Sequence, residues 1–174
     1  MIGRPEASEY PARYHRYIDL VPEDDVSTAM AEQLDRTVAF LRAIPADDTD
    51  RRYAPGKWTV REVVGHILDT ERIFGYRLLT FARGDSVTTP RADEELYVRN
   101  ARFSRYPLAD WIDEFAQVRR SHVMLVRHLT PDAWTRIGNS SIGPISVRAM
   151  AYVMLGHERH HLGIIRDKYL DGGV

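Results

Sequence analysis

Three histidines in residues 156–165 have the type and the spacing that a metal ion requires of its ligands. His157, His160 and His161 fall within five consecutive positions. On a helix, side chains four residues apart lie on one face with their Cβ atoms roughly 6 Å apart, so His157 and His161 can point at a single ion. His160 is rotated by about 100° from His161 on the same helix. We expect it to flank the site or to support a ligand.

The same two histidines lie on the apolar face of the predicted helix. Apolar residues recur at helical spacing on both sides of them, at Val147, Met150, Met154, Ile164 and Ile165. An imidazole buried in such a face without a partner costs about 1–3 kcal/mol. One metal ion would satisfy both rings, so the pattern favours a metal site. The alternative is two core histidines, each bonded to a neighbouring side chain or to water.

The composition is that of an ordinary globular protein, and it limits the kinds of site that the protein can hold. The chain has 174 residues, of which 44% are apolar and 28% charged, and this predicts one domain over residues 1–174 with an ample core. It contains no cysteine, so disulfides, thiolate ligands and a cysteine nucleophile are excluded. A metal site must therefore use histidine or carboxylate ligands.

Charge and hydropathy indicate that the protein binds neither nucleic acid nor a membrane. The 24 basic and 25 acidic residues leave a net charge of −1, which argues against an extended anionic partner. No stretch approaches about 18 consecutive apolar residues, and the N-terminus lacks the apolar region of a secretory signal. The absence of cysteine fits a reducing compartment. We expect a soluble protein of the cytoplasm.

The apolar periodicity predicts an all-α protein, a bundle of four long amphipathic helices without strand pairs. The helices are expected over residues 24–44, 59–83, 108–129 and 146–169. Residues 1–23 are rich in proline and tyrosine, and we expect an extended arm that its aromatic rings anchor on the body. The longer connections are residues 84–107, with a short helix around 92–100, and a loop over 133–144.

Several residues mark where these helices begin, end or approach a neighbour. Thr59 followed by Glu62 has the spacing of a capping box, and Gly84 suits the position after a helix end. Ser146 is expected to cap the last helix. Gly75 lies in the middle of the second helix, where glycine costs about 1 kcal/mol against alanine. We therefore expect it to allow the close approach of another helix or of a ligand.

His66 is the third ligand that the sequence predicts. It lies on the second helix, beside the apolar stripe and close to the helix start. An antiparallel pairing of the second and fourth helices would bring it to the depth of His157 and His161. With the long connection between the second and third helices, this pairing favours an up-down-down-up topology. Three neutral imidazoles with one open position are typical of a catalytic zinc site, although nickel and other divalent ions are equally compatible with imidazole.

Glu71 and His122 are the candidates for a catalytic role, because both lie on the apolar faces of their helices. The alternative for Glu71 is a salt bridge to an arginine such as Arg119. The alternative for His122 is a satisfied position in the core. Asp69 and Glu158 are the other nearby carboxylates that could accept hydrogen bonds from the ligands.

A resemblance to the DinB-like (YfiT-like) superfamily of metal-dependent enzymes is carried by two segments, APGKWTVREVVGHILDTERIFGYRLLTFARGD and GPISVRAMAYVMLGHERHHLGIIRDKYL. The resemblance extends over nearly the whole chain. In that superfamily, one histidine of the second helix and the first and last histidines of an H-x-x-H-H run bind a divalent ion. These positions correspond to His66, His157 and His161, and all three histidines are present here.

The resemblance implies a four-helix bundle, often a homodimer, with a metal at one end of a cleft. Better understood members are S-transferases and isomerases that use low-molecular-weight thiols such as bacillithiol, mycothiol or glutathione, where the metal would stabilise the thiolate of the cosubstrate. Others are described as hydrolases. The expected cofactor is therefore a zinc or nickel ion, and the expected partner is a small-molecule substrate, with a low-molecular-weight thiol as the favoured class.

Three functions are compatible with these observations. The first is a metal-dependent enzyme, for which a thiol S-transferase is favoured over a hydrolase. Arg72, Arg77 and Arg119 could form a basic pocket wall for an acidic thiol, or could be solvated or salt-bridged arginines. The second is a non-catalytic metal-binding or stress-response module, in which Glu71 or a fourth histidine closes the coordination sphere. The third is a helical dimer whose histidines are core residues.

Overall fold

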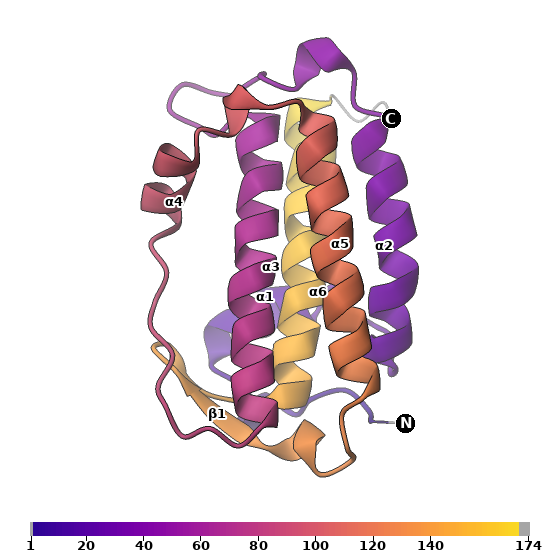
Figure 1. Cartoon of the computed structure of the whole chain (residues 1–174), viewed down its shortest axis with the longest axis vertical. Coiled ribbons are helices and arrows are strands. Elements are labelled where there is room, and N and C mark those ends of the chain that lie inside the picture. The colour runs from indigo at the N-terminus through magenta and orange to yellow at the C-terminus, as the bar shows by residue number, and fades with distance from the viewer. Residues whose placement is uncertain (1, 171–174) are drawn as a thin grey trace.

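Four long helices form an up-down-down-up bundle in the computed structural model, which describes residues 2–170 (Figure 1). They are α2 (Val26–Arg42), α3 (Val60–Ala82), α5 (Leu108–Arg127) and α6 (Val147–Ile164). In the view of Figure 1, α2 and α6 run upward, whereas α3 and α5 run downward. The predicted fold class and topology are confirmed. No helix within residues 2–170 is long and apolar enough to cross a membrane.

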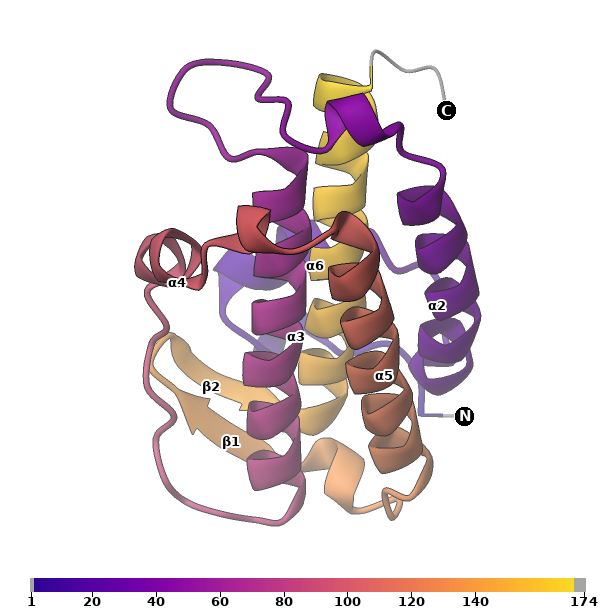
Figure 2. The same cartoon turned by 45° about the horizontal axis from the view of Figure 1, so that its top comes forward.

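Two parallel neighbours, α3 and α5, require a connection that returns along the bundle. Residues 83–107 make this return outside the four helices and carry the short helix α4 (Glu94–Ala101), as Figures 1 and 2 show. The predicted helix around 92–100 is thus confirmed. Antiparallel packing of α3 against α6 follows from the same topology, because α6 runs upward beside the descending α3.

The helix ends follow the local sequence signals. The Thr59 hydroxyl accepts a hydrogen bond from the Glu62 amide at 3.1 Å, and the Glu62 carboxylate accepts one from the Thr59 amide at 2.7 Å, so the capping box is present. Gly84 follows the end of α3 with φ of +75°, the left-handed conformation that glycine adopts without strain. Ser146 caps α6 through the Ala149 amide at 3.0 Å.

The predicted loop over residues 133–144 is wrong, because part of it is a β-hairpin. Strand β1 (Ile137–Ser140) pairs antiparallel with β2 (Gly143–Ser146), and Thr89 of the long connection bridges to Ser140. Strands of four residues with glycine and proline among them have too little alternation to be recognised from the sequence. The hairpin therefore ties the returning connection to the bottom of the bundle.

The N-terminal arm is less extended than predicted. It contains single helical turns, η1 (Ala7–Glu9), η2 (Ala12–Tyr14) and α1 (His15–Ile18). Tyr10, Tyr14 and Tyr17 are buried against the bundle, so the aromatic rings anchor the arm as expected. At the other end of the chain, α6 continues as a π-helical turn, η6 (Ile165–Tyr169), close to the predicted end.

The apolar core is divided into two clusters, one towards each end of the bundle. On α3, for example, residues 60–68 belong to one cluster and residues 74–82 to the other. The stretches between the clusters on α3, α5 and α6 supply buried charged residues, Glu71, Arg119 and Glu158. These three buried charged side chains thus lie at the middle level of the bundle.

Candidate metal centre

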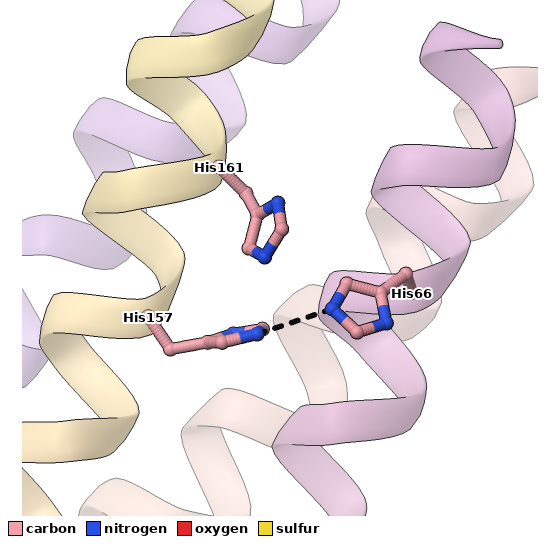
Figure 3. A group of neighbouring side chains, drawn as sticks. All are labelled: His66, His157 and His161. Carbon is pink, nitrogen blue, oxygen red and sulfur yellow. Dashed lines mark hydrogen bonds between the residues drawn. The ribbon is translucent and has the colours of Figure 1, made fainter. Parts of the chain in front are cut away.

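Three histidine rings converge between α3 and α6. His66 comes from α3, and His157 and His161 come from successive turns of α6 (Figure 3). One nitrogen from each ring lies within 4.8 Å of the other two, and the Nε2 atoms of His66 and His157 are 3.1 Å apart. The antiparallel helix pair therefore brings together the three residues that the sequence predicted as metal ligands.

Burial keeps these imidazoles neutral at physiological pH. Desolvation lowers the pKa of His66 to about 4. It also lowers the pKa of His161 to about 3, with a further contribution from the neighbouring His66, and it lowers the pKa of His157 well below its ordinary value. A neutral imidazole offers a nitrogen lone pair, which is the form that coordinates a metal ion. The environment thus suits metal ligation.

Aromatic side chains enclose the three rings. The Trp58 ring centroid lies 4.9 Å from that of His66, and the rings of Tyr17 and Phe74 lie 5.4 and 5.5 Å from that of His157. The sequence did not predict that these residues belong to the site. Phe74 lies about two turns after His66 on α3, so helical geometry could have predicted that it lies near the site. Trp58 and Tyr17 lie outside the long helices, where no periodicity places a side chain.

The histidines form part of the wall of a cavity of about 270 Å³. From α3, the cavity is lined by His66, Asp69, Thr70, Ile73, Phe74 and Arg77; from α6, by His157, His160 and His161. The N-terminal arm adds residues 13, 14, 16 and 17, and the long connection adds residues between 91 and 98. A metal ion held by the three imidazoles would therefore have one side facing a space large enough for a small molecule.

His160 lies beside the triad and outside it. Its ring centroid is 5.1 Å from that of His161 and 5.5 Å from that of Tyr17, and it lines the cavity. Among the described residues, the group that could share one ion consists of His66, His157 and His161. His160 thus flanks the site, as its helical position predicts.

Glu71 is engaged in a buried ion pair and does not line the cavity. The Arg119 guanidinium donates to both of its carboxylate oxygens, at 2.7 and 2.8 Å, and both side chains are buried. Burial acts to raise the pKa of Glu71, but Arg119 and a hydrogen bond from His122 outweigh it and hold the pKa at about 2. The structure therefore places Glu71 in the salt bridge that the sequence offered as its alternative role.

Arg119 joins Glu71 to a second buried carboxylate. Its Nη1 atom lies 2.7 Å from Glu158, whose other oxygen accepts a hydrogen bond from the Thr37 hydroxyl. Burial raises the pKa of Glu158 although Arg119 opposes the shift. The network connects α2, α3, α5 and α6 at the level of the histidines, because Glu158 directly follows His157 on α6.

His122 reaches the same network from α5. Its Nδ1 atom lies 2.8 Å from the Glu71 carboxylate, and its ring packs against Gly75. A Cβ atom at Gly75 would come within 2.0 Å of Nε2 of His122, so this glycine allows the close approach that its mid-helix position predicts. His122 does not line the cavity, and the structure brings it to Glu71 rather than to the three histidines.

The three arginines proposed for a pocket wall have different environments. Arg72 is half-exposed and pairs with Glu114 and, at 3.6 Å, with Asp69, whereas Arg119 is fully buried in the ion pairs described above. Of the three, Arg77 alone lines the cavity.

Comparison with known sequences identifies the family. Residues 29–165 match the sequence pattern that defines the DinB superfamily. The chain belongs to this superfamily. A relative from Oceanobacillus iheyensis, named "putative metal-dependent hydrolase", is 26% identical over 127 residues, which cover 72% of this chain and 73% of the relative.

Two solved structures share the fold of this DinB protein. YfiT from Bacillus subtilis, described as a probable metal-dependent hydrolase with an unusual four-helix bundle topology, superimposes with a TM-score of 0.70 at 19% identity, over 97% of this chain and 93% of YfiT. A mycothiol-dependent maleylpyruvate isomerase superimposes with a TM-score of 0.66 at 10% identity, over 87% of this chain and 62% of the isomerase.

Proposed function

We propose that this DinB protein is a divalent-metal-dependent enzyme acting on a small molecule, with His66, His157 and His161 as the metal ligands. The observation that carries the proposal is the convergence of three neutral imidazole nitrogens within 4.8 Å of one another at the wall of a cavity. Names given to relatives support it, since the Oceanobacillus protein and YfiT are both described as metal-dependent.

The ligand set favours a transition metal, and zinc and nickel are the ions that we propose. Imidazole suits zinc, nickel, copper and iron, whereas magnesium and calcium prefer oxygen ligands. Three protein ligands and a free side are typical of catalytic rather than structural zinc sites. Bound here, such an ion would supply Lewis acidity that favours the deprotonated form of a thiol or a water molecule.

The residues of the chain have separate parts in this proposal. The three histidines hold the ion, and Trp58 and Phe74 cover them with aromatic surface that limits the access of water. In thiol S-transfer, the thiol loses its proton to solvent or to a nearby base. Its sulfur then bonds to an electrophilic carbon, and the leaving group departs with the electron pair of the broken bond.

We favour thiol S-transfer over hydrolysis because the cavity has few carboxylates to serve as a general base for water. Among its lining residues the carboxylates are Asp69, which lies 3.6 Å from Arg72, and the exposed Glu94. A fold neighbour that depends on mycothiol agrees with this choice. Hydrolysis is the second candidate, and the names of the Oceanobacillus relative and of YfiT support it.

The first test is the metal content of the purified protein by elemental mass spectrometry. We expect about one divalent ion per chain in the wild type and in a His128→Ala variant, which alters an exposed histidine away from the cavity. The His66→Ala variant should lose the ion. Wild-type protein without metal after incubation with zinc or nickel, or a His66→Ala variant that keeps its metal, would refute the proposal.

A second test separates the two reactions. Metal-loaded protein is incubated with mycothiol, bacillithiol or glutathione and a chlorobimane electrophile, or with a nitrophenyl ester and no thiol. We expect the protein to conjugate the thiol to the electrophile faster than the uncatalysed reaction does. The His66→Ala variant should not accelerate the conjugation. Ester hydrolysis with the same dependence on His66, and no conjugation, would assign the protein to the hydrolases.

A non-catalytic metal-binding or stress-response role is the alternative to an enzyme, and it requires a closed coordination sphere. X-ray absorption of the zinc-loaded protein distinguishes the two, since an enzyme should retain an exchangeable ligand from solvent. A homodimer and a cytoplasmic location are further predictions, which light scattering and cell fractionation would test.

A further inference from the structure

Arg77 is a buried cation that has no carboxylate partner among residues 2–170. The residue is 4% exposed, and it lines the cavity. Within residues 2–170 its guanidinium makes one hydrogen bond, from Nη2 to the Pro90 carbonyl at 2.7 Å, and its buried Nε has no acceptor. Its Cζ atom also lies 5.7 Å from the centroid of the Phe74 ring, a cation–π contact that offsets part of the cost of burying the charge and leaves room for an anionic partner. Arg119 on α5 is fully buried and shows the usual solution, because two glutamates neutralise it.

Arg77 and the metal ligand His66 belong to the same face of α3. They are 11 positions apart, which corresponds to about three helical turns and a rise of roughly 16 Å. Both line the same cavity. The cavity therefore has a candidate metal position towards one end of this face and a guanidinium towards the other.

The surface between these two ends has apolar and polar parts in similar shares. Ile73 and Phe74 form the apolar part on the intervening turns of α3, where Asp69 and Thr70 are polar, and Val98 and Ile142 face the same cavity. The apolar part accommodates a hydrocarbon or aromatic segment, because the apolar area removed from water stabilises the complex by about 25 cal/mol per Å².

The charged residues around the cavity also favour an anion. Arg13, Arg16 and Arg91 line it together with Arg77, against two carboxylates, Asp69 and Glu94. The first three arginines are exposed at the rim, where they would attract an anionic ligand over distances of about a Debye length. Arg77 lies deeper and would pair with it directly.

We infer that Arg77 is the binding residue for a carboxylate group on the substrate or cosubstrate. This inference rests on the proposed function. It defines the ligand class as an organic acid with a metal-binding group at one end, an apolar middle and a carboxylate at the other end. A guanidinium that is already buried and held by the Pro90 carbonyl loses little freedom on pairing. Arg77 acts in recognition, at a distance from the reacting atoms.

The anion site can be tested on metal-free protein, independently of the histidines. Octanoate and octanol share an apolar chain and differ in the carboxylate, so calorimetric titration with each measures what the charge adds. We expect octanoate to bind wild-type protein at least about tenfold more tightly than octanol. The Arg77→Met variant should lose this preference, and Arg77→Lys should keep part of it.

Two controls make the outcome specific. Arg120→Met removes an exposed arginine of α5 that does not line the cavity, and His66→Ala removes the metal site; both should keep the preference for octanoate. An equal preference in wild type and Arg77→Met would overturn the inference. Because no metal is present, that failure is distinct from failure of the proposed function.

Cobalt-loaded protein then tests whether one ligand spans both ends of the cavity. Binding of ω-mercapto-octanoate and ω-mercapto-octanol can be followed through sulfur-to-cobalt charge-transfer absorption. In the wild type, we expect the acid to bind at least about tenfold more tightly than the alcohol. In Arg77→Met, the acid and the alcohol should bind with equal affinity. This variant should still bind cobalt. Cobalt binding with no preference for the acid would exclude the bridging ligand.

Discussion

The Nε2 atoms of His66 and His157 lie 3.1 Å apart, although 91 residues separate the two histidines in the chain. An ion bound between them would join α3 to α6 and would bind the folded protein only. At an ion concentration about 100-fold above Kd, binding stabilises the native state by about 2.7 kcal/mol. We therefore predict that chelation lowers the melting temperature by roughly 5–10 °C.

This difference between chelated and zinc-loaded protein should disappear in the His66→Ala variant and persist in His128→Ala. Differential scanning calorimetry of the three proteins measures it. A wild-type melting temperature that does not respond to zinc or chelator would show that the histidines are ordinary core residues.

The ion pair of Glu71 predicts that the free energy of unfolding falls at acid pH. Its pKa is about 2 in the folded protein against an ordinary value of 4.5, because Arg119 and His122 favour the carboxylate. A depressed carboxyl pKa adds stability that is present above the unfolded pKa and is lost as the pH falls towards the folded pKa. The full contribution is about 3 kcal/mol at neutral pH. We expect roughly 1–2 kcal/mol of it to be lost between about pH 6 and about pH 3.5.

Urea unfolding of the wild type and of a Glu71→Gln variant at the two pH values isolates this contribution. The variant should lose less stability on acidification than the wild type does. Glu32→Gln is the matched control, because Glu32 makes an exposed pair with Arg36 and should leave the pH dependence unchanged. Identical acid sensitivity in all three proteins would contradict the assignment.

Gly75 and Gly163 are glycines inside helices with opposite surroundings. A Cβ atom at Gly75 would collide with His122, whereas nothing lies within 4 Å of one at Gly163. We expect Gly75→Ala to destabilise the protein by about 1–3 kcal/mol and Gly163→Ala to stabilise it by up to about 1 kcal/mol. Adding His122→Ala to Gly75→Ala should restore part of the loss, and double-mutant analysis of urea unfolding measures it.

Gly156 allows the N-terminal arm to pack closely against α6, beside the candidate metal centre. A Cβ atom there would lie 2.0 Å from the Tyr17 carbonyl oxygen, so Gly156→Ala should push the arm away from α6. Trypsin cleavage after Arg13 and Arg16 should then become faster than in the wild type, as resolved by mass spectrometry. Gly163→Ala should be cleaved at the wild-type rate, and unchanged cleavage in Gly156→Ala would exclude this packing.

The features that the sequence predicted correctly rest on helical periodicity and local capping. The same period that placed Val147 and Met154 on a buried face also placed His157 and His161 there, and the choice of His66 as their partner favoured the antiparallel pairing of the two helices. Glu71 was left with two roles, since a carboxylate on an apolar stripe can serve chemistry or an ion pair. Choosing between these two roles requires the position of Arg119 on another helix, and no local sequence pattern gives that position.

The cavity wall could not be predicted for a different physical reason. Tyr17 lies in a single helical turn and Trp58 in a loop, where side-chain direction depends on tertiary contacts rather than on a long repeating pattern. The hairpin over residues 137–146 was missed because its strands are short and rich in turn-forming residues. Arg77 was one of three candidate arginines, and only its environment separated it from Arg72 and Arg119.

The return of the chain between the parallel helices α3 and α5 has an evolutionary consequence. The histidines stand on packed helices, where most substitutions would disturb the core. The opposite side of the cavity comes from residues 91–98 of the returning connection and residues 13–17 of the arm, many of them exposed. Such segments tolerate substitution and insertion far better than helices in a core. Descendants of this protein could thus acquire new substrates by altering these two segments while inheriting the histidine triad unchanged.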